Sequence, residues 1–344
     1  MRNSARRKEK AEIGARSTFA APLPECIGRP SLANVMLSPE YLAGFVDGEG
    51  YLGVARIRRR HRSPEYCLRM SVYNSDLKVL NDIREVYGGT LSSPGQRERA
   101  WKPGYALIWT NAAAAKMISE IGPFLVVKAN QAKALLAFDK RLQVVKRSRD
   151  RDGRLLPYSS RELRARETFY KRLKWLNRRG VRRWNRQNAT SRAGAWRLSA
   201  KYVAGFIDAE GALMITRSFP ADCRSPQHHG RVSVSNTKRN VLDAIHGRYG
   251  GILTYQPARQ AGWSHGYQLV WTNGMIIALL RAVGRHLRIK RKQAAVLIEF
   301  IEQKRAAKQR RDGSRSAPLP ARVIAPREGY RRRIRELNAR GSRH

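Results

Sequence analysis

The chain contains the same sequence pattern twice. LSPEYLAGFVDGEG occupies 37–50 and LSAKYVAGFIDAEG occupies 198–211, and each copy combines small residues, an aromatic residue and two acids. Matching segments follow both copies in the same order: 71–74 with 233–236, 87–89 with 249–251, 109–111 with 271–273, Lys128 with Lys290, and 176–180 with 337–341. The offset between the copies drifts by only one residue. The chain is therefore a tandem duplication, which predicts two pseudosymmetric halves.

Its charge points to a polyanionic partner. The 344 residues include 69 Lys and Arg against 26 Asp and Glu, a formal net charge of +43. So large a positive field favours nucleic acid as the partner. A merely solvated basic surface, of the ribosomal type, is the alternative, but it does not account for the duplicated acids.

Several other classes are disfavoured. No apolar run approaches the roughly 20 residues of a membrane-spanning helix, so we expect no membrane partner. Cys26, Cys67 and Cys223 are isolated and odd in number, which predicts reduced thiols rather than a disulfide framework or a zinc knuckle. His228-His229 has no partner ligands at metal spacing, so a loop origin is expected for this pair.

The duplication divides the chain into four parts. We expect a basic disordered tail at 1–36, a first repeat with a trailing basic helix at 37–180, a basic linker at 181–197, and a second repeat with its trailing helix at 198–341. The tail could instead be a transit peptide, although Glu9, Glu12 and Glu25 count against that. The bacterial cytoplasm and an organelle both remain open as locations. The linker could run along a DNA backbone or form a solvated strap.

Residue patterns predict an α+β fold. Leu68, Met70 and Val72 alternate with polar neighbours, which is typical of a strand with one buried face. Ser38 ahead of Pro39 is a helix N-cap signal, and Asn111 is expected to cap a later helix. The first repeat is thus expected to have helices at 39–46, 76–87, 111–121, 128–145 and 161–177, and strands at 51–57, 66–74, 89–93 and 105–111. The order is αββαββα followed by two further helices. The second repeat has the same order, its trailing helix beginning after Pro326, and each repeat should form one antiparallel four-stranded sheet.

The acid that ends each motif is electrostatically unusual. A helix C-terminus carries partial negative charge, so Glu49 and Glu210 at that position are repelled unless a cation compensates them. Carboxylates and carbonyls are the oxygen ligands that Mg²⁺ prefers. Small residues at 43–44 and 204–205 would let two helix backbones approach closely. If the motif helices pack together, both acids lie side by side near the pseudo-two-fold axis.

LAGFVDGEG and VAGFIDAEG resemble the two motifs of a LAGLIDADG homing endonuclease of the single-chain, two-repeat class. The resemblance covers roughly 37–341, with matching downstream segments in both repeats. It implies a saddle of two antiparallel sheets that straddles DNA, with the motif helices forming the interface beneath. It also implies a site-specific, divalent-metal-dependent DNA endonuclease.

The resemblance also assigns site residues. Metal ligation is implied for Glu49 and Glu210, helped by the carbonyls of Gly48 and Ala209. The polar residue that orders water in the family corresponds to Asn74 and Asn236. The family's basic residue corresponds to Lys128 and Lys290. The family often has Gln where this chain has Asn. Other interpretations stay open: the glutamates could pair with arginines, the asparagines could cap helices, and the lysines could contact phosphates. Asp47 and Asp208 are expected to bond helix-end or loop amides.

The chemistry can be argued independently. Phosphodiester hydrolysis needs a positioned water and charge neutralisation, which Mg²⁺ or Mn²⁺ can supply, and no Ser-His-Asp set competes with this mechanism. Two such sites would make a double-strand break. Sequence recognition is expected from outward strand faces entering the major groove, with Arg58, Arg69, Arg217 and Arg231 as candidates. Because these faces differ between the halves, the target should be asymmetric and about 20 bp long.

Two alternative functions remain. Proteins that resemble this family also act as RNA maturases, and the basic segments suit intron RNA as well as DNA. A non-cleaving DNA-binding regulator is the other, although retention of both acids disfavours it. No obligate protein partner is expected, since one chain already carries both halves.

Overall fold

A computed structural model describes residues 37–339 apart from short gaps. The gaps are 59–62, 94–102, 146, 179–197, 222, 259, 261–263 and 310–317. The expected tail at 1–36 and the linker at 181–197 therefore lie outside the described residues, as does Cys26.

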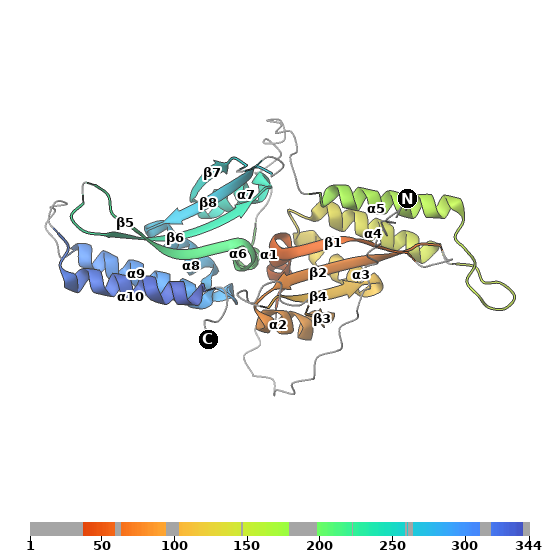
Figure 1. The fold of residues 1–344 in the computed structure, drawn as a ribbon, viewed down its shortest axis with the longest axis horizontal. Helices are drawn as coiled ribbons and strands as arrows, with labels where there is room; N and C mark the ends of the chain where they lie inside the picture. The colour runs from red at the N-terminus through yellow and green to blue at the C-terminus, as the bar shows by residue number, and fades with distance from the viewer. Residues whose placement is uncertain are drawn as a thin grey trace, which may run out of the picture. The chain divides into compact units, whose positions relative to one another are not determined.

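The first repeat begins with a capped helix. Ser38 accepts a hydrogen bond from the Tyr41 amide, and Pro39 occupies the first turn of α1 (Pro39–Glu49), as the sequence predicted. The repeat continues through β1 (Gly50–Ile57), β2 (Glu65–Asn74), α2 (Leu77–Tyr87), β3 (Thr90–Ser92), β4 (Tyr105–Thr110), α3 (Asn111–Ile121), η1 (Gly122–Phe124), α4 (Ala129–Val144) and α5 (Ser160–Leu176). Its sheet is antiparallel with the order β1-β2-β4-β3 (Figure 1).

The second repeat reproduces this order. It comprises α6 (Ala200–Glu210), β5 (Gly211–Ser218), β6 (Gln227–Asn236), α7 (Arg239–Tyr249), β7 (Ile252–Gln256), β8 (Gly266–Thr272), α8 (Gly274–Val283), η4 (Gly284–His286), α9 (Arg291–Gln309) and α10 (Ala321–Leu337). Its antiparallel sheet has the order β5-β6-β8-β7. The predicted α+β class and the four strands per repeat are confirmed. Within the described part of the chain, no helix is long and apolar enough to cross a membrane.

Each sheet has one face covered by helices. In the first repeat, Leu68, Met70 and Val72 are buried beneath helices α3 and α4, as their alternation predicted. Tyr51, Arg69 and Tyr73 belong to the opposite parity and so face away from these helices. We call this side the open face of the sheet.

The repeated Tyr-Gly-Gly and Trp-Thr-Asn segments hold the middle of each repeat together. The Trp109 indole donates to the Tyr87 carbonyl at 3.0 Å, and Gly88 and Gly89 turn the chain beneath it with φ of 66° and 102°. A Cβ on Gly89 would lie 2.9 Å from the Trp109 ring. Only glycine suits this turn, because it combines positive φ with contact against the indole.

The trailing helices protect the edge strands. Asn177, just past α5, donates its amide to the Leu52 carbonyl on β1 at 2.7 Å, and Asn338 past α10 does the same to Leu213 on β5. Gln131 reaches the end of α5 from α4. The two asparagine bonds occupy edge-strand acceptors that would otherwise be open to pairing.

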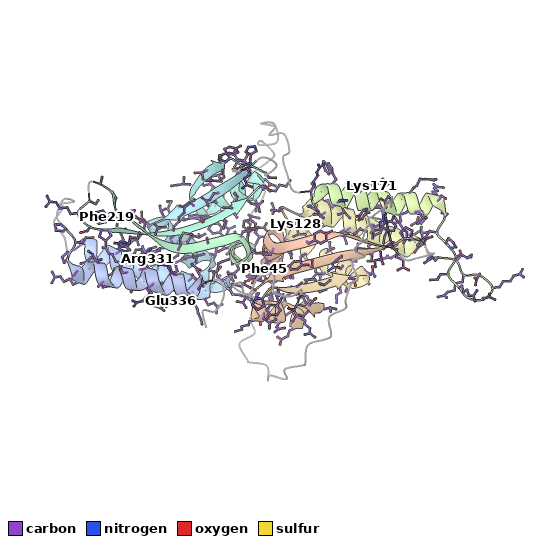
Figure 2. The ribbon with its side chains drawn as sticks, in the orientation of Figure 1. Phe45, Lys128, Lys171, Phe219, Arg331 and Glu336 are labelled. Carbon is purple, nitrogen blue, oxygen red and sulfur yellow. The ribbon has the colours of Figure 1, made fainter. Side chains whose placement is uncertain are left out.

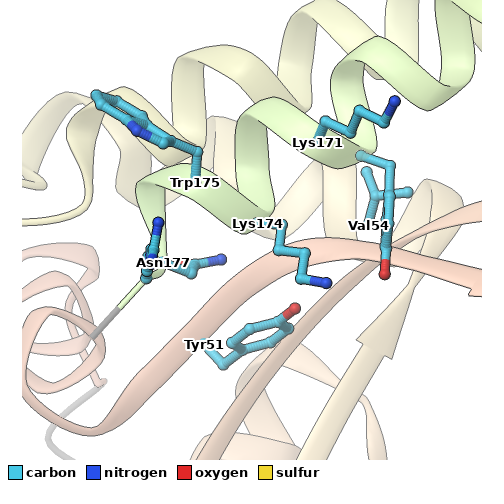
Figure 3. Close-up of a pocket in the computed structure, with 8 residues that line it drawn as sticks. Tyr51, Val54, Lys171, Lys174, Trp175 and Asn177 are labelled. Atoms are coloured by element: carbon cyan, nitrogen blue, oxygen red, sulfur yellow. The ribbon is translucent and has the colours of Figure 1, made fainter. Parts of the chain in front are cut away.

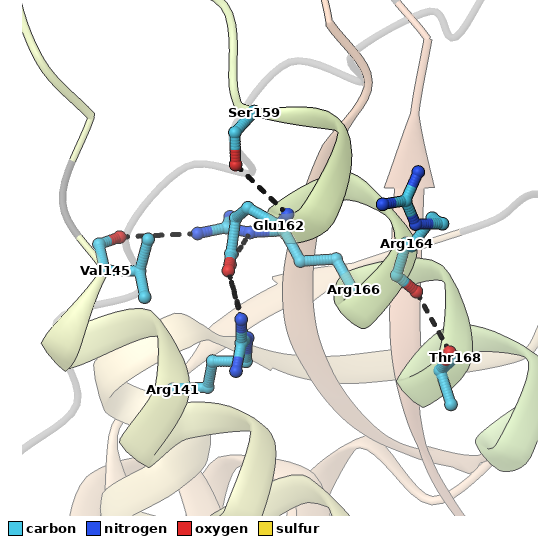
Figure 4. Close-up of polar contacts among 7 residues, drawn as sticks. All are labelled: Arg141, Val145, Ser159, Glu162, Arg164, Arg166 and Thr168. Atoms are coloured by element: carbon cyan, nitrogen blue, oxygen red, sulfur yellow. Dashed lines mark hydrogen bonds and ion pairs between the residues drawn. The ribbon is translucent and has the colours of Figure 1, made fainter.

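A buried ion cluster fastens α5 to α4. Glu162 receives hydrogen bonds from Arg141 on α4 and from Arg166 on its own helix, and Ser159 caps α5 through the Glu162 amide (Figure 4). Burial alone would raise the pKa of Glu162, but the bonds from Arg166 and Arg141 outweigh it and hold the pKa below the ordinary value of 4.5.

Three local predictions were wrong. His228 and His229 lie within strand β6 instead of in a loop, and His228 is buried and bonded to Glu328 of α10. α10 begins at Ala321, so Pro326 lies inside the helix instead of before it, with its ring exposed. Asn111 does not cap α3: Thr110 is the N-cap, and Asn111 is the first helical residue, with a left-handed φ of 46°. Asparagine tolerates that conformation better than other residues with a side chain.

Candidate functional site

The two motif helices pack backbone against backbone. A Cβ on Gly44 of α1 would lie 2.0 Å from the Tyr202 carbonyl of α6, and a Cβ on Gly205 would lie 2.0 Å from the Tyr41 carbonyl. Larger residues are excluded at both positions. The predicted close approach of α1 and α6 through small residues is therefore confirmed (Figure 1).

This crossing brings the ends of both helices together. α1 ends at Glu49 and α6 at Glu210, and both residues are exposed. A Cβ on Gly48 would lie 2.3 Å from the Ala209 Cβ and 3.0 Å from the Glu210 Cγ. The last turns thus touch, and the two carboxylates lie in one neighbourhood.

Lys128 and Lys290 cap the helix ends that carry these acids. The Lys128 ammonium donates to the Val46 carbonyl at 2.9 Å and to the Asp47 carbonyl at 2.6 Å. Figure 2 labels Lys128 near Phe45, a residue of α1. Lys290 donates in the same way to the carbonyls of Ile207, at 2.8 Å, and Asp208. Each positive charge meets the partial negative charge of a helix C-terminus, which offsets the repulsion of the terminal glutamate.

The electrostatics of Lys290 place the acids near it. Burial lowers the pKa of the Lys290 ammonium, while the charges of Asp208, Glu49 and Glu210 act in the opposite direction. Because Glu49 belongs to the other repeat, its influence on Lys290 shows that the second lysine senses both terminal acids. Lys290 and the two terminal acids thus belong to one cluster of charges.

The first acid of each motif positions the lysine. Asp47 is buried and accepts four hydrogen bonds at 2.7–3.0 Å, from the amides of Val126, Val127 and Lys128 and from the Tyr202 hydroxyl. Asp208 is bonded in the same way by the amides of 288–290 and the Tyr41 hydroxyl, at 2.7–3.3 Å. The predicted bonding of both aspartates to loop amides is confirmed.

Sequence reasoning missed the tyrosine contribution. Tyr41 and Tyr202 occupy the same position in both motif copies, which was the available signal. Each hydroxyl bonds the aspartate of the opposite repeat, 2.8 Å for Tyr41 to Asp208 and 2.7 Å for Tyr202 to Asp47.

Asn74 and Asn236 lie at the same end of their sheets as the acids. Gly50, directly after Glu49, pairs with Val72, so Asn74 follows two residues beyond that pair. Its side-chain oxygen accepts from the Asp76 amide at 2.8 Å, and that of Asn236 accepts from the Lys238 amide at 2.8 Å. These bonds form local turns, while the N-cap of α2 is Asp76.

The four candidate DNA-contacting arginines do not share one face. Arg69 and Arg231 lie on the open faces, opposite Gly53 and Met214 of the neighbouring strands. Arg58 is exposed directly after β1. Arg217 instead has the parity of the buried strand residues, and its Nε pairs with Glu328 of α10 at 3.0 Å.

Arg217 is therefore not retained as a groove contact. Arg56, its counterpart in the first repeat, pairs in the same way with Glu167 of α5 at 3.0 Å. Leu52 and Val54 are buried at alternate positions of β1, and Arg56 has the same parity. Because the register of β1 with β2 runs unbroken, no bulge turns Arg56 to the other face, and its partner on the trailing helix accounts for a charged residue at this position.

The donor set suits a hard divalent cation. Within the described ranges, no three His, Cys, Asp or Glu side chains are grouped to hold a metal by themselves. Mg²⁺ is commonly held by one or two carboxylates together with water and substrate phosphates, which two converging glutamates match.

Comparison with known proteins identifies the fold. No family model and no curated protein matches the sequence. Among solved structures, I-SmaMI bound to uncleaved DNA target in the presence of calcium ions matches with a TM-score of 0.62 at 12% identity, covering 87% of this chain and 99% of that one. The homing endonuclease I-GzeII in complex with its DNA target matches with a TM-score of 0.59 at 12% identity, covering 86% and 97%. These neighbours are LAGLIDADG homing endonucleases, and the chain shares their two-repeat fold.

Proposed function

We propose that this chain, with the fold of the LAGLIDADG homing endonucleases, is a site-specific DNA endonuclease that makes a double-strand break in a long asymmetric target. The observation that carries the proposal is the convergence of Glu49 and Glu210 where α1 crosses α6. The structural neighbours were solved on DNA targets, and the net charge of +43 suits the same partner.

In this function each glutamate serves one strand. Glu49 and Glu210 would hold Mg²⁺ or Mn²⁺, with the carbonyls of Gly48 and Ala209 as further oxygen ligands. A bound divalent cation neutralises charge on the scissile phosphate and lowers the pKa of a water molecule. One I-SmaMI complex was obtained with calcium ions, which is consistent with a divalent cation in this fold.

The other residues prepare this centre. Lys128 and Lys290 fix the ends of α1 and α6, and their charge favours the developing negative charge of the reacting phosphate. Asn74 and Asn236 lie at the same sheet ends, where the remaining amide group can orient water.

Target recognition belongs to the open faces of the two sheets. An antiparallel sheet face offers alternate side chains to base edges in the major groove, and arginine reads guanine well. Arg69 and Arg231 lie on these faces, and Arg58 lies just beyond β1. The faces differ elsewhere, for example Tyr51 against Ala212, which predicts an asymmetric site.

A cleavage-site selection tests the proposal. The full chain would be incubated with a randomised duplex library and Mg²⁺ or Mn²⁺, and the ends produced would be sequenced, beside a Glu49→Gln/Glu210→Gln control. The proposal predicts breaks at one asymmetric motif with the wild-type chain alone. Tight duplex binding without breaks in either metal would contradict it and would favour a DNA-binding regulator.

A further inference from the structure

A hollow lies between the edge of the first sheet and its trailing helix. It has a volume of about 620 Å³ and is lined from β1 by Tyr51 and from α5 and its end by Tyr170, Lys171, Lys174, Trp175 and Arg178. Figure 3 shows Lys174 pointing from α5 toward the Tyr51 ring on β1. Tyr51 follows Glu49 by two residues, so one wall of the hollow is close in sequence to the candidate active site.

The aromatic side chains here are unusually exposed. Trp175 is 58% exposed and Tyr51 is 41% exposed. An aromatic ring left in water forgoes the favourable burial of a large apolar area. Exposed aromatic groups gathered at one hollow mark a binding surface more often than scattered ones do.

The charge of the hollow is of one sign. Lys171, Lys174 and Arg178 supply three cations, and the residues that line the hollow, all in the described part of the chain, include no carboxylate. Cations beside exposed rings match a ligand that has both phosphates and flat bases. Base stacking on aromatic side chains next to basic groups is the usual mode of single-stranded nucleic-acid binding.

The second repeat shows that the fold does not require these rings. At the positions equivalent to Tyr51, Tyr170 and Trp175 it has Ala212, Arg331 and Glu336. The basic positions are kept, since Arg332 and Arg335 stand where the first repeat has Lys171 and Lys174. The packing residues are also kept: Asn338 holds the β5 edge as Asn177 holds β1. The aromatic set is therefore an addition specific to the first repeat.

We propose that this hollow binds an unpaired segment of nucleic acid, with separate bases stacked on Trp175 and on Tyr51 and with its phosphates held by Lys171 and Lys174. Paired bases are already stacked inside a duplex, so the ligand is a single strand or an unpaired segment. Both single-stranded RNA and single-stranded DNA carry this chemistry. The hollow adjoins the duplex face of the proposed endonuclease through Tyr51, and its lining residues on α5 extend beyond that face.

The test is a binding measurement with the full chain. Fluorescein-labelled oligo-U RNA and oligo-dT DNA would be titrated by anisotropy over a series of salt concentrations. Trp175→Ala should weaken binding about fivefold or more without changing the slope of log affinity against log salt, because stacking releases no counterions. Lys171→Ala should reduce that slope by about 0.7.

The second repeat provides the matched control. Glu336→Ala changes the equivalent position and should leave single-strand affinity unreduced. A 5-iodouridine strand should photo-crosslink to Trp175 or Tyr51. If Trp175→Ala weakened binding of only the RNA or only the DNA strand, the result would support the site and identify its ligand.

Unchanged affinity of Trp175→Ala for both strands would overturn the proposal. Duplex cleavage by Trp175→Ala, measured in parallel, should remain at the wild-type level. Failure of this inference is therefore separable from failure of the endonuclease proposal.

Discussion

The Tyr202 hydroxyl of the second repeat donates a 2.7 Å hydrogen bond to the buried Asp47 carboxylate of the first. The same carboxylate holds the amides that lead into α4, including that of Lys128. Contact between the repeats and placement of the candidate catalytic lysine therefore depend on one side chain. The reciprocal pair, Tyr41 and Asp208, repeats the arrangement.

Removing one of these hydroxyls should destabilise the whole chain. Tyr202→Phe keeps the packing but deprives the buried Asp47 of a hydrogen-bond donor. The free energy of unfolding should therefore fall by about 1–3 kcal/mol. Urea denaturation measures this change. Tyr73→Phe, at an exposed tyrosine of the open face, is the control and should change little. Equal stability of both variants would show that the inter-repeat bond is unimportant.

The glycines at the helix crossing should not accept a methyl group. Gly44→Ala would place its Cβ 2.0 Å from the Tyr202 carbonyl, so α1 and α6 would have to separate. We expect the free energy of unfolding to fall by about 3 kcal/mol or more, as for other strained core substitutions. Thermal unfolding of soluble protein is the readout.

Gly247 offers a matched control for that substitution. It lies within α7, and a Cβ there would meet nothing within 4 Å. Gly247→Ala should therefore stabilise the chain by about 0.5–1 kcal/mol through helix propensity. Equal effects of the two alanines would contradict the close backbone packing.

Glu162 should make stability sensitive to acid. Its pKa is lowered in the folded chain, so its contribution is fully present above the ordinary value of 4.5 and is lost as pH falls through the lowered pKa. Glu162→Gln leaves Arg166 buried with a weakened partner and should cost about 3 kcal/mol at neutral pH. Denaturant unfolding at a series of acidic pH values should show that the difference in unfolding free energy between wild type and Glu162→Gln shrinks below pH 4.5. A difference independent of pH would contradict the ion cluster.

Lys290 should affect stability in the opposite pH range. Its folded pKa is lowered, so between that pKa and the ordinary value of 10.5 the unfolded chain binds more protons and stability rises with pH. Lys290→Met removes the cap of α6 and should cost about 1–2 kcal/mol. The difference from wild type should grow as pH rises toward 10.5. Lys133→Met, exposed on α4, should show neither effect.

The sequence predicted the elements well because their signals are local. Strand alternation at Leu68, Met70 and Val72 and the Ser38 cap depend on neighbours in the chain, and both were confirmed. The duplication further predicted two similar halves whose motif helices pack against each other. Repetition also marked Asn177 and Lys128 as landmarks before their contacts were known.

What the sequence could not provide were contacts over long separations. The amide of Asn177 bonds Leu52, 125 residues away, and nothing in either local pattern indicates it. The local pattern around Arg217 predicts a DNA contact, because its partner Glu328 lies on a helix more than a hundred residues later and leaves no signal near Arg217. Charged residues on strands are thus assigned to a face reliably only when the opposing helix is known.

Strand-specific cleavage by single glutamate variants tests the central claim most directly. On a supercoiled plasmid carrying the selected site, the wild-type chain should produce linear DNA. Glu49→Gln and Glu210→Gln should each leave at most a nick, in opposite strands, because each carboxylate serves one strand. If either variant linearised the plasmid at the wild-type rate, the paired-glutamate account of this site would be contradicted.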